Sequence, residues 1–144
     1  MPFLQRVNPD AKILPIVMGD QRSKLCSILA ELLTDVLSPD GVVFVASSDL
    51  SHFHDQRSAQ RLDGVAATDI LAALPTKLLD DIEQNRCEAC GGGPIAVVLA
   101  ACMHFGAEKV SILRQCTSGD VSGDHARVVG YLSAAISAGT AGRR

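Results

Sequence analysis

Two polar side chains with complementary chemistry, Asp49 and His52, follow an apolar run at residues 42–46. The β-branched run is typical of a buried strand, and open α/β sheets place their ligand sites at the carboxyl ends of such strands. A carboxylate and an imidazole at this spacing can serve as metal ligands or as an acid/base pair. The alternative is an aspartate that caps the amides of Ser51 and His52 beside a surface histidine. His54 extends the pattern to His-x-His, either as a second ligand on the same face or, as we expect, as a solvated residue at a helix start.

Cys90 is the second chemically capable residue, and it lies in a glycine-rich stretch that also contains Cys87. A structural zinc site would need a second ligand pair, and a thioredoxin-like site would need the pair at a helix start after a strand; neither condition holds. Cys90 alone precedes an apolar helix, whose amino-terminal partial charge favours a thiolate. The alternative is a glycine-rich turn with an incidental thiol.

The elements that must position these residues alternate between strand and helix. An apolar helical face begins at Leu25, with Asp20 as its predicted N-cap. We expect strands at 12–18, 42–47, 109–116 and 128–136, and helices at about 25–37, 55–73, from Pro75, and 95–105. This order predicts an α/β layered sandwich with a mostly parallel or mixed central sheet flanked by helices. We expect residues 1–136 to form one domain and residues 137–144 to form a flexible tail.

Composition narrows the class of protein. Of 144 residues, 47% are hydrophobic and 20% are charged, which is typical of a globular domain rather than a disordered chain. A net charge of −3 without a basic run argues against a nucleic-acid partner, and no apolar stretch predicts a membrane span. Five cysteines, an odd number, without a recognisable export signal indicate reduced thiols in a cytoplasmic protein.

Three motifs carry a resemblance to a known family. They are Ser47-Ser48-Asp49-Leu50-Ser51-His52-Phe53, then Cys90-Gly91-x-x-Pro94-Ile95-x-x-x-Leu99, then Thr117-Ser118-Gly119-Asp120-x-x-Gly123-Asp124-x-x-x-Val128-Val129-Gly130-Tyr131. In this order and at these separations they resemble the Memo-like family, whose bacterial members are called AmmeMemoRadiSam system protein B. The segment 2–4 is similar to the end of a further family segment, Glu-x-x-Leu-Pro-Phe-Leu.

The resemblance implies the fold of the class III extradiol (LigB-like) dioxygenases and a cavity at the strand ends. It implies Asp49 and His52 as catalytic residues, His52 and Cys90 as metal ligands, and iron, copper or zinc as the metal, with no organic cofactor. It also implies that the chain corresponds to the C-terminal half of the family. Two further histidine ligands would then belong to the other half, and an oligomer or that half would cover an exposed sheet surface.

Two classes of function follow from the resemblance. The first is a metal-dependent redox or dioxygenase-like enzyme, and the second is a non-catalytic binding or adaptor protein on the same fold. An AMMECR1-like protein or a radical-SAM protein is the expected partner by family association.

Overall fold

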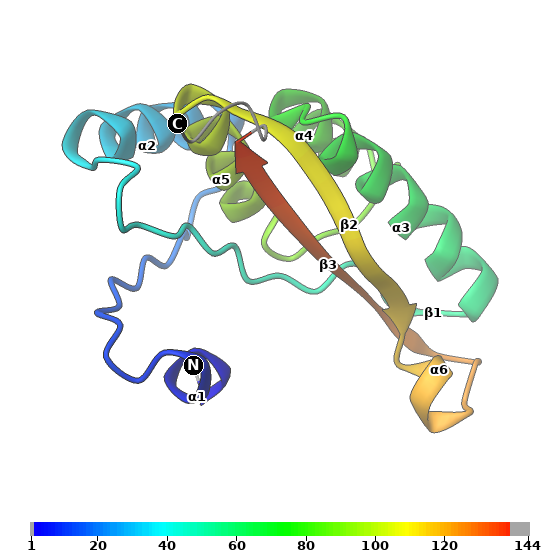
Figure 1. Cartoon of the computed structure of the whole chain (residues 1–144). Coiled ribbons are helices and arrows are strands. Elements are labelled where there is room, and N and C mark those ends of the chain that lie inside the picture. The colour runs from blue at the N-terminus through cyan, green and yellow to red at the C-terminus, as the bar shows by residue number, and fades with distance from the viewer. Residues whose placement is uncertain (1, 139–144) are drawn as a thin grey trace.

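The computed structural model, which describes residues 2–138, combines helices with a small antiparallel sheet (Figure 1). The helices are α1 (Pro2–Val7), α2 (Ser23–Val36), α3 (Gln56–Leu71), α4 (Pro75–Glu83), α5 (Gly92–His104) and α6 (Gly119–Ser122). The strands are β1 (His52–His54), β2 (Ala107–Thr117) and β3 (Val128–Ala138). This mixture of helices and sheet confirms the predicted α/β class.

The long helices lie where the apolar periodicity predicts them, but their caps differ from the prediction in one case. Asp55 caps α3 by accepting hydrogen bonds from the backbone N–H groups of Arg57 and Ser58, both at 3.1 Å. The predicted N-cap of α2, Asp20, is wrong, because the cap position is Arg22. Asp20 instead forms an ion pair with the Arg22 guanidinium at 2.6 Å.

The sheet has the strand order β1-β3-β2, and both of its pairings are antiparallel. This differs from the mostly parallel or mixed sheet that the alternation of elements predicts. For the β2–β3 pair the reason is the connection between the two strands, which holds only the short helix α6 and its flanking loops. A parallel pairing needs a crossover of a dozen or more residues, whereas a shorter connection returns the chain antiparallel.

Of the four predicted strands, two do not form within the described residues. Residues 12–18 and 42–47 have no regular secondary structure and belong to neither pairing of the sheet. The strand instead forms just downstream, at His52–His54, where β3 supplies the backbone partner. A β-branched sequence favours extended backbone, but a strand exists only where a second backbone offers hydrogen bonds.

The carboxyl end of the chain also differs from the prediction of a tail at 137–144. Ser137 and Ala138 belong to β3, in register with Lys109 and Ala107 of β2. The remainder of the predicted tail, 139–144, lies outside the described residues.

The main core lies between the sheet and helices α3, α4 and α5. It is built from fully buried side chains of Leu50, Leu78 and Leu99, with Ala66, Ile70 and Cys87. A smaller cluster joins α2 to α5 through Cys26, Ala30 and Val97. No helix within the described residues has the length and apolar character needed to cross a membrane.

An ion-pair network fixes α4 against α3 at the edge of the main core. Lys77 contacts the buried carboxylates of Asp69 at 2.6 Å and Asp81 at 2.9 Å. The Arg86 guanidinium, and then Lys77, lower the pKa of Asp81 to about 2. The network holds the loop that leads to Cys87 and Cys90.

Candidate functional site

The segment 47–49 and the loop that carries Cys90 are joined by backbone hydrogen bonds. The Cys90 N–H donates to the Asp49 carbonyl at 3.2 Å, and the Gly91 N–H donates to the Ser48 hydroxyl at 2.8 Å. Gly91 is required here, since a Cβ at this position would lie 2.6 Å from the Ser47 carbonyl oxygen. The tertiary structure therefore brings together two of the three predicted motifs.

The Cys90 side chain is exposed, and one backbone donor and one hydroxyl face its sulfur. The backbone N–H of Asp49 donates to Cys90 Sγ at 3.3 Å, and Ser48 Oγ lies 3.7 Å from the same atom. The Ser48 hydroxyl itself donates to the Asp49 carbonyl at 2.7 Å. Cys90 also lies two residues before the start of α5, next to its N-cap Gly91.

Gln21 clamps the loop from the other side. Its side-chain amide donates to the Cys90 carbonyl at 3.0 Å and accepts from the Gly93 N–H at 2.7 Å. The loop is thus held by the segment before α2 as well as by residues 47–49, which limits the positions that the thiol can take.

Asp49 and His52 lie close to each other, as predicted. His52 Nε2 is 3.7 Å from Asp49 Oδ2, and both side chains are partly exposed. The distance is longer than a direct hydrogen bond and fits an ion pair or a contact through water.

The capping alternative for Asp49 is excluded by the partners of the two amides. The Ser51 N–H donates to the buried carboxylate of Asp63 at 3.0 Å, and the His52 N–H donates to Glu88 at 3.1 Å. The carboxylate of Asp49 is therefore left available for chemistry at the site.

Glu88 is a residue that the sequence analysis did not single out. Besides accepting from the His52 N–H, its carboxylate lies 2.8 Å from His54 Nε2. His54 is therefore paired with Glu88 rather than solvated at a helix start. The only signal in the sequence was the position of Glu88, two residues before Cys90.

Phe53, between the two histidines, has a left-handed backbone with φ of 62°. A bulky side chain rarely adopts this conformation, and doing so costs about 1–3 kcal/mol. The register between β1 and β3 shifts at the same point, since His52 pairs with Val129 and His54 with Val128. The resulting bulge re-aims the two histidines relative to a regular strand.

The donor types around Cys90 suit a transition metal, but the described residues alone do not complete a metal centre. Thiolate, imidazole and carboxylate are ligands of zinc, iron and copper. Within residues 2–138, no three His, Cys, Asp or Glu side chains are arranged around one point as a metal site requires.

Cys87 takes no part in the site. It is buried, and burial raises the pKa of its thiol to about 11, with a further contribution from the nearby carboxylate of Asp81. Both cysteines of the C-x-x-C motif are free thiols.

The third motif closes the end of the β2–β3 pair rather than adding a donor to Cys90. Asp120 accepts from the Thr117 N–H at 2.7 Å, and this hydrogen bond lowers the pKa of the Asp120 carboxyl. Ser118 Oγ accepts from the N–H of Val129, the partner of His52 in the sheet. The motif therefore supports β1 indirectly, through β3.

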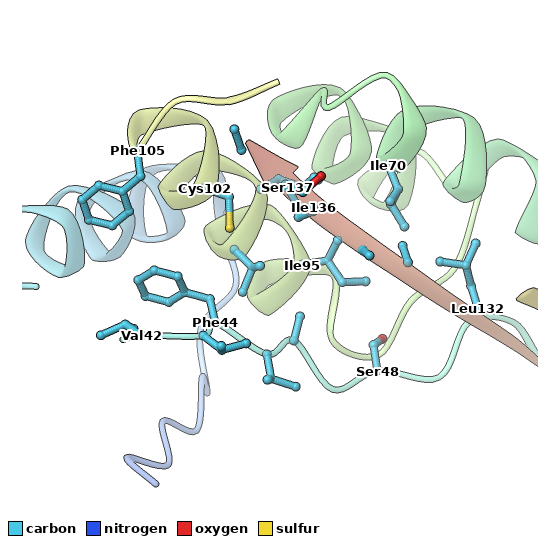
Figure 2. A pocket seen from close by; sticks show the side chains of 18 of the residues that line it. Val42, Phe44, Ser48, Ile70, Ile95, Cys102, Phe105, Leu132, Ile136 and Ser137 are labelled. Carbon is cyan, nitrogen blue, oxygen red and sulfur yellow. The ribbon is translucent and has the colours of Figure 1, made fainter. Parts of the chain in front are cut away.

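A large apolar cavity lies beside the site and meets it at Ser48. Its volume is about 620 Å³, and its walls come from residues 42–46, α5 and β3. Figure 2 shows Phe44 and Ile95 projecting into this space, with Ser48 toward its end near β3. Asp49, His52 and Cys90 do not line the cavity.

Comparisons with known proteins agree with the three motifs. A family model described as Memo-like protein matches residues 1–135. MEMO1 family proteins of Methanosarcina mazei and Thermotoga maritima are 37% identical over 136 residues and 39% identical over 137 residues. These matches cover 92% and 94% of this chain but 51% and 48% of the relatives. The chain thus spans about half the length of the curated relatives that it matches.

Proposed function

Because the chain belongs to the Memo-like protein family, we propose that Asp49, His52 and Cys90 contribute to a metal-binding, redox-active site. The observation that carries the proposal is the hydrogen bond from the Asp49 N–H to Cys90 Sγ at 3.3 Å. It ties the Ser-Ser-Asp motif to an exposed thiol at a helix start. An exposed free thiol in this position is accessible to a metal ion or to a thiol reagent.

Each residue has a distinct role in the proposed site. Cys90 and His52 are the metal ligands, and Asp49 accepts or holds a proton beside the His52 imidazole. Iron, copper or zinc suit this donor set, and iron or copper would supply the redox chemistry. The remaining ligands lie outside the described residues, which is consistent with relatives about twice as long.

Metal binding tests the proposal directly. In equilibrium dialysis of the reduced protein against Zn²⁺, Fe²⁺ or Cu⁺, wild type is expected to bind metal weakly through the two ligands that this chain supplies. Both Cys90→Ala and His52→Ala should lose most of that metal. Cys116→Ala, which removes a thiol from β2, is the matched control and should keep the metal. Equal metal content in wild type and in both site variants would contradict the proposal.

Thiol labelling gives a second readout that does not depend on turnover. At pH 8, iodoacetamide should modify Cys90 far faster than Cys87, because a pKa of about 11 leaves only about 0.1% of Cys87 as thiolate. Saturating Zn²⁺ should slow the labelling of Cys90. Peptide mass spectrometry measures both rates, and comparable labelling of Cys87 and Cys90 would oppose a special role for Cys90.

The broader expectations from the family stay predictions. These are a dioxygenase-like or other oxidoreductase activity, an AMMECR1-like or radical-SAM partner, and a cytoplasmic location. Loss of metal in the variants above would support the site without deciding among these activities.

A further inference from the structure

Three segments, residues 12–18, residues 42–46 and β3, lie beside α5 with apolar cavities between them. The segment 42–46 has the cavity of about 620 Å³ on one flank, with β3 as the far wall. On its other flank a cavity of about 320 Å³ separates it from residues 12–18. Val98 of α5 lines both cavities. Figure 1 draws residues 12–18 and 42–47 as open chain, while β3 is a strand.

Both open segments have the side-chain pattern of strands in a sheet. Alternate residues Lys12, Leu14, Ile16 and Met18 line the smaller cavity, as one face of an extended chain does. In the other segment Phe44 packs against Phe105 with ring centroids 6.1 Å apart, while Val43 on the opposite face is 84% exposed. Apolar residues on both faces are typical of a strand covered on both sides.

The backbone of both segments lacks partners. Within residues 2–138, no backbone–backbone hydrogen bond involves residues 12–19 or 41–47. A row of unpaired N–H and C=O groups beside apolar surface is a template for strand addition. A small apolar ligand could fill the cavities, but it would leave these polar groups unpaired at a cost in free energy.

The relatives indicate what occupies these positions. This chain covers 51% and 48% of two MEMO1 family proteins, so each of them carries about as much polypeptide again. We propose that strands from that unmatched portion of a Memo-like polypeptide pair with residues 42–46 and 12–18 and complete the sheet. The portion can be joined covalently or can come from a separate chain. This mode of binding is strand addition, with backbone hydrogen bonds for affinity and the apolar cavities for side-chain selection.

The test uses hydrogen exchange, which reports backbone pairing directly. In the free chain, peptides that cover 12–18 and 42–46 should exchange rapidly. Co-expression with the unmatched portion of the Thermotoga maritima relative should give a one-to-one complex in which exchange of 42–46 slows by about tenfold or more. A covalent chimera of the two parts, joined in the order of the relative, tests the same pairing within one polypeptide.

Val43→Asp should abolish the complex and the protection without changing the stability of the free chain, because Val43 is already exposed. Val121→Asp, at an 87% exposed position in α6, is the matched control and should leave the complex intact.

Three results would overturn the proposal. They are slow exchange of 42–46 in a monomeric free chain, slow exchange through self-association seen by light scattering, and fast exchange in both the co-expressed pair and the chimera. None of these measurements involves metal. A Cys90→Ala chain should behave as wild type, so failure of strand addition is distinguishable from failure of the proposed metal site.

Discussion

The continuous stretch from residue 42 to residue 54 contains two regions that differ in backbone pairing. The first region is residues 42–47, and the second is residues 50–54. In the second region the Leu50 N–H donates to the Gly130 carbonyl at 2.9 Å, and the Gly130 N–H donates to the Ser51 carbonyl at 2.9 Å. Leu50 is 2% exposed. In the first region, the more apolar of the two, Val43 is 84% exposed and the described residues supply no backbone partner. The polar region is ordered into the sheet while the apolar region is left at its margin.

This difference shows that pairing, and not hydrophobicity, decides where a strand forms. β-branched residues favour extended backbone, but the backbone groups must still find hydrogen-bond partners. β3 supplies those partners only opposite residues 50–54. Of the proposed site residues, His52 lies in this paired region and Asp49 directly precedes it.

The largest expected effect is on stability, and it distinguishes the paired region from the unpaired segment 12–18. Leu50→Ala should lower the free energy of unfolding by about 2–5 kcal/mol, because it empties a buried position in the main core. Leu14→Ala makes the same change at a 76% exposed position and should alter the free energy of unfolding by no more than about 0.5 kcal/mol. Urea denaturation measures both, and similar losses would show that residues 12–18 are packed as tightly as the core.

A second prediction concerns Gly91, which lies against the junction of the two regions. In Gly91→Ala the new Cβ would meet the Ser47 carbonyl oxygen at 2.6 Å, so unfolding free energy should fall by about 1–3 kcal/mol. Gly64→Ala within α3 has open space around its Cβ and should gain about 0.5–1 kcal/mol from lower backbone entropy. Opposite signs are therefore expected in the same denaturation assay. A neutral Gly91→Ala would mean that the Cys90 loop is not seated on residues 47–48.

The smallest effect tests how β1 is held in place. Glu88→Ala removes the acceptor of the His52 N–H and should cost about 0.5–1.5 kcal/mol. Exchange at the His52 amide should accelerate while that at Leu50 stays slow, because the Leu50 amide bonds to Gly130. Glu108→Ala, at an exposed position in β2, is the control and should leave both amides unchanged. If the His52 amide were equally protected from exchange in Glu88→Ala, pairing with β3 alone would hold β1 in place.

Helices were the most predictable part of the fold, because their hydrogen bonds are local. The apolar spacing from Leu25 onward predicts α2, and Pro75 marks the start of α4. Errors arise where the partner is distant in sequence. Asp20 is predicted as a cap but pairs with Arg22, and residues 42–47 are predicted as a strand but have no backbone partner within residues 2–138.

The sequence by itself determined the family and named Asp49, His52 and Cys90, because motif order and residue type are properties of the chain alone. Only the tertiary structure decided what surrounds them. It places the Asp49 N–H against the sulfur of Cys90 and pairs the Glu88 carboxylate with the His52 N–H and the His54 ring. It also leaves the Asp49 carboxylate without the capping role that was its alternative. These contacts join residues 34 to 41 positions apart, and they exist only once the core between the sheet and α5 has formed. A periodic pattern records which face is apolar, whereas the choice of polar partner depends on chain segments that only folding brings together.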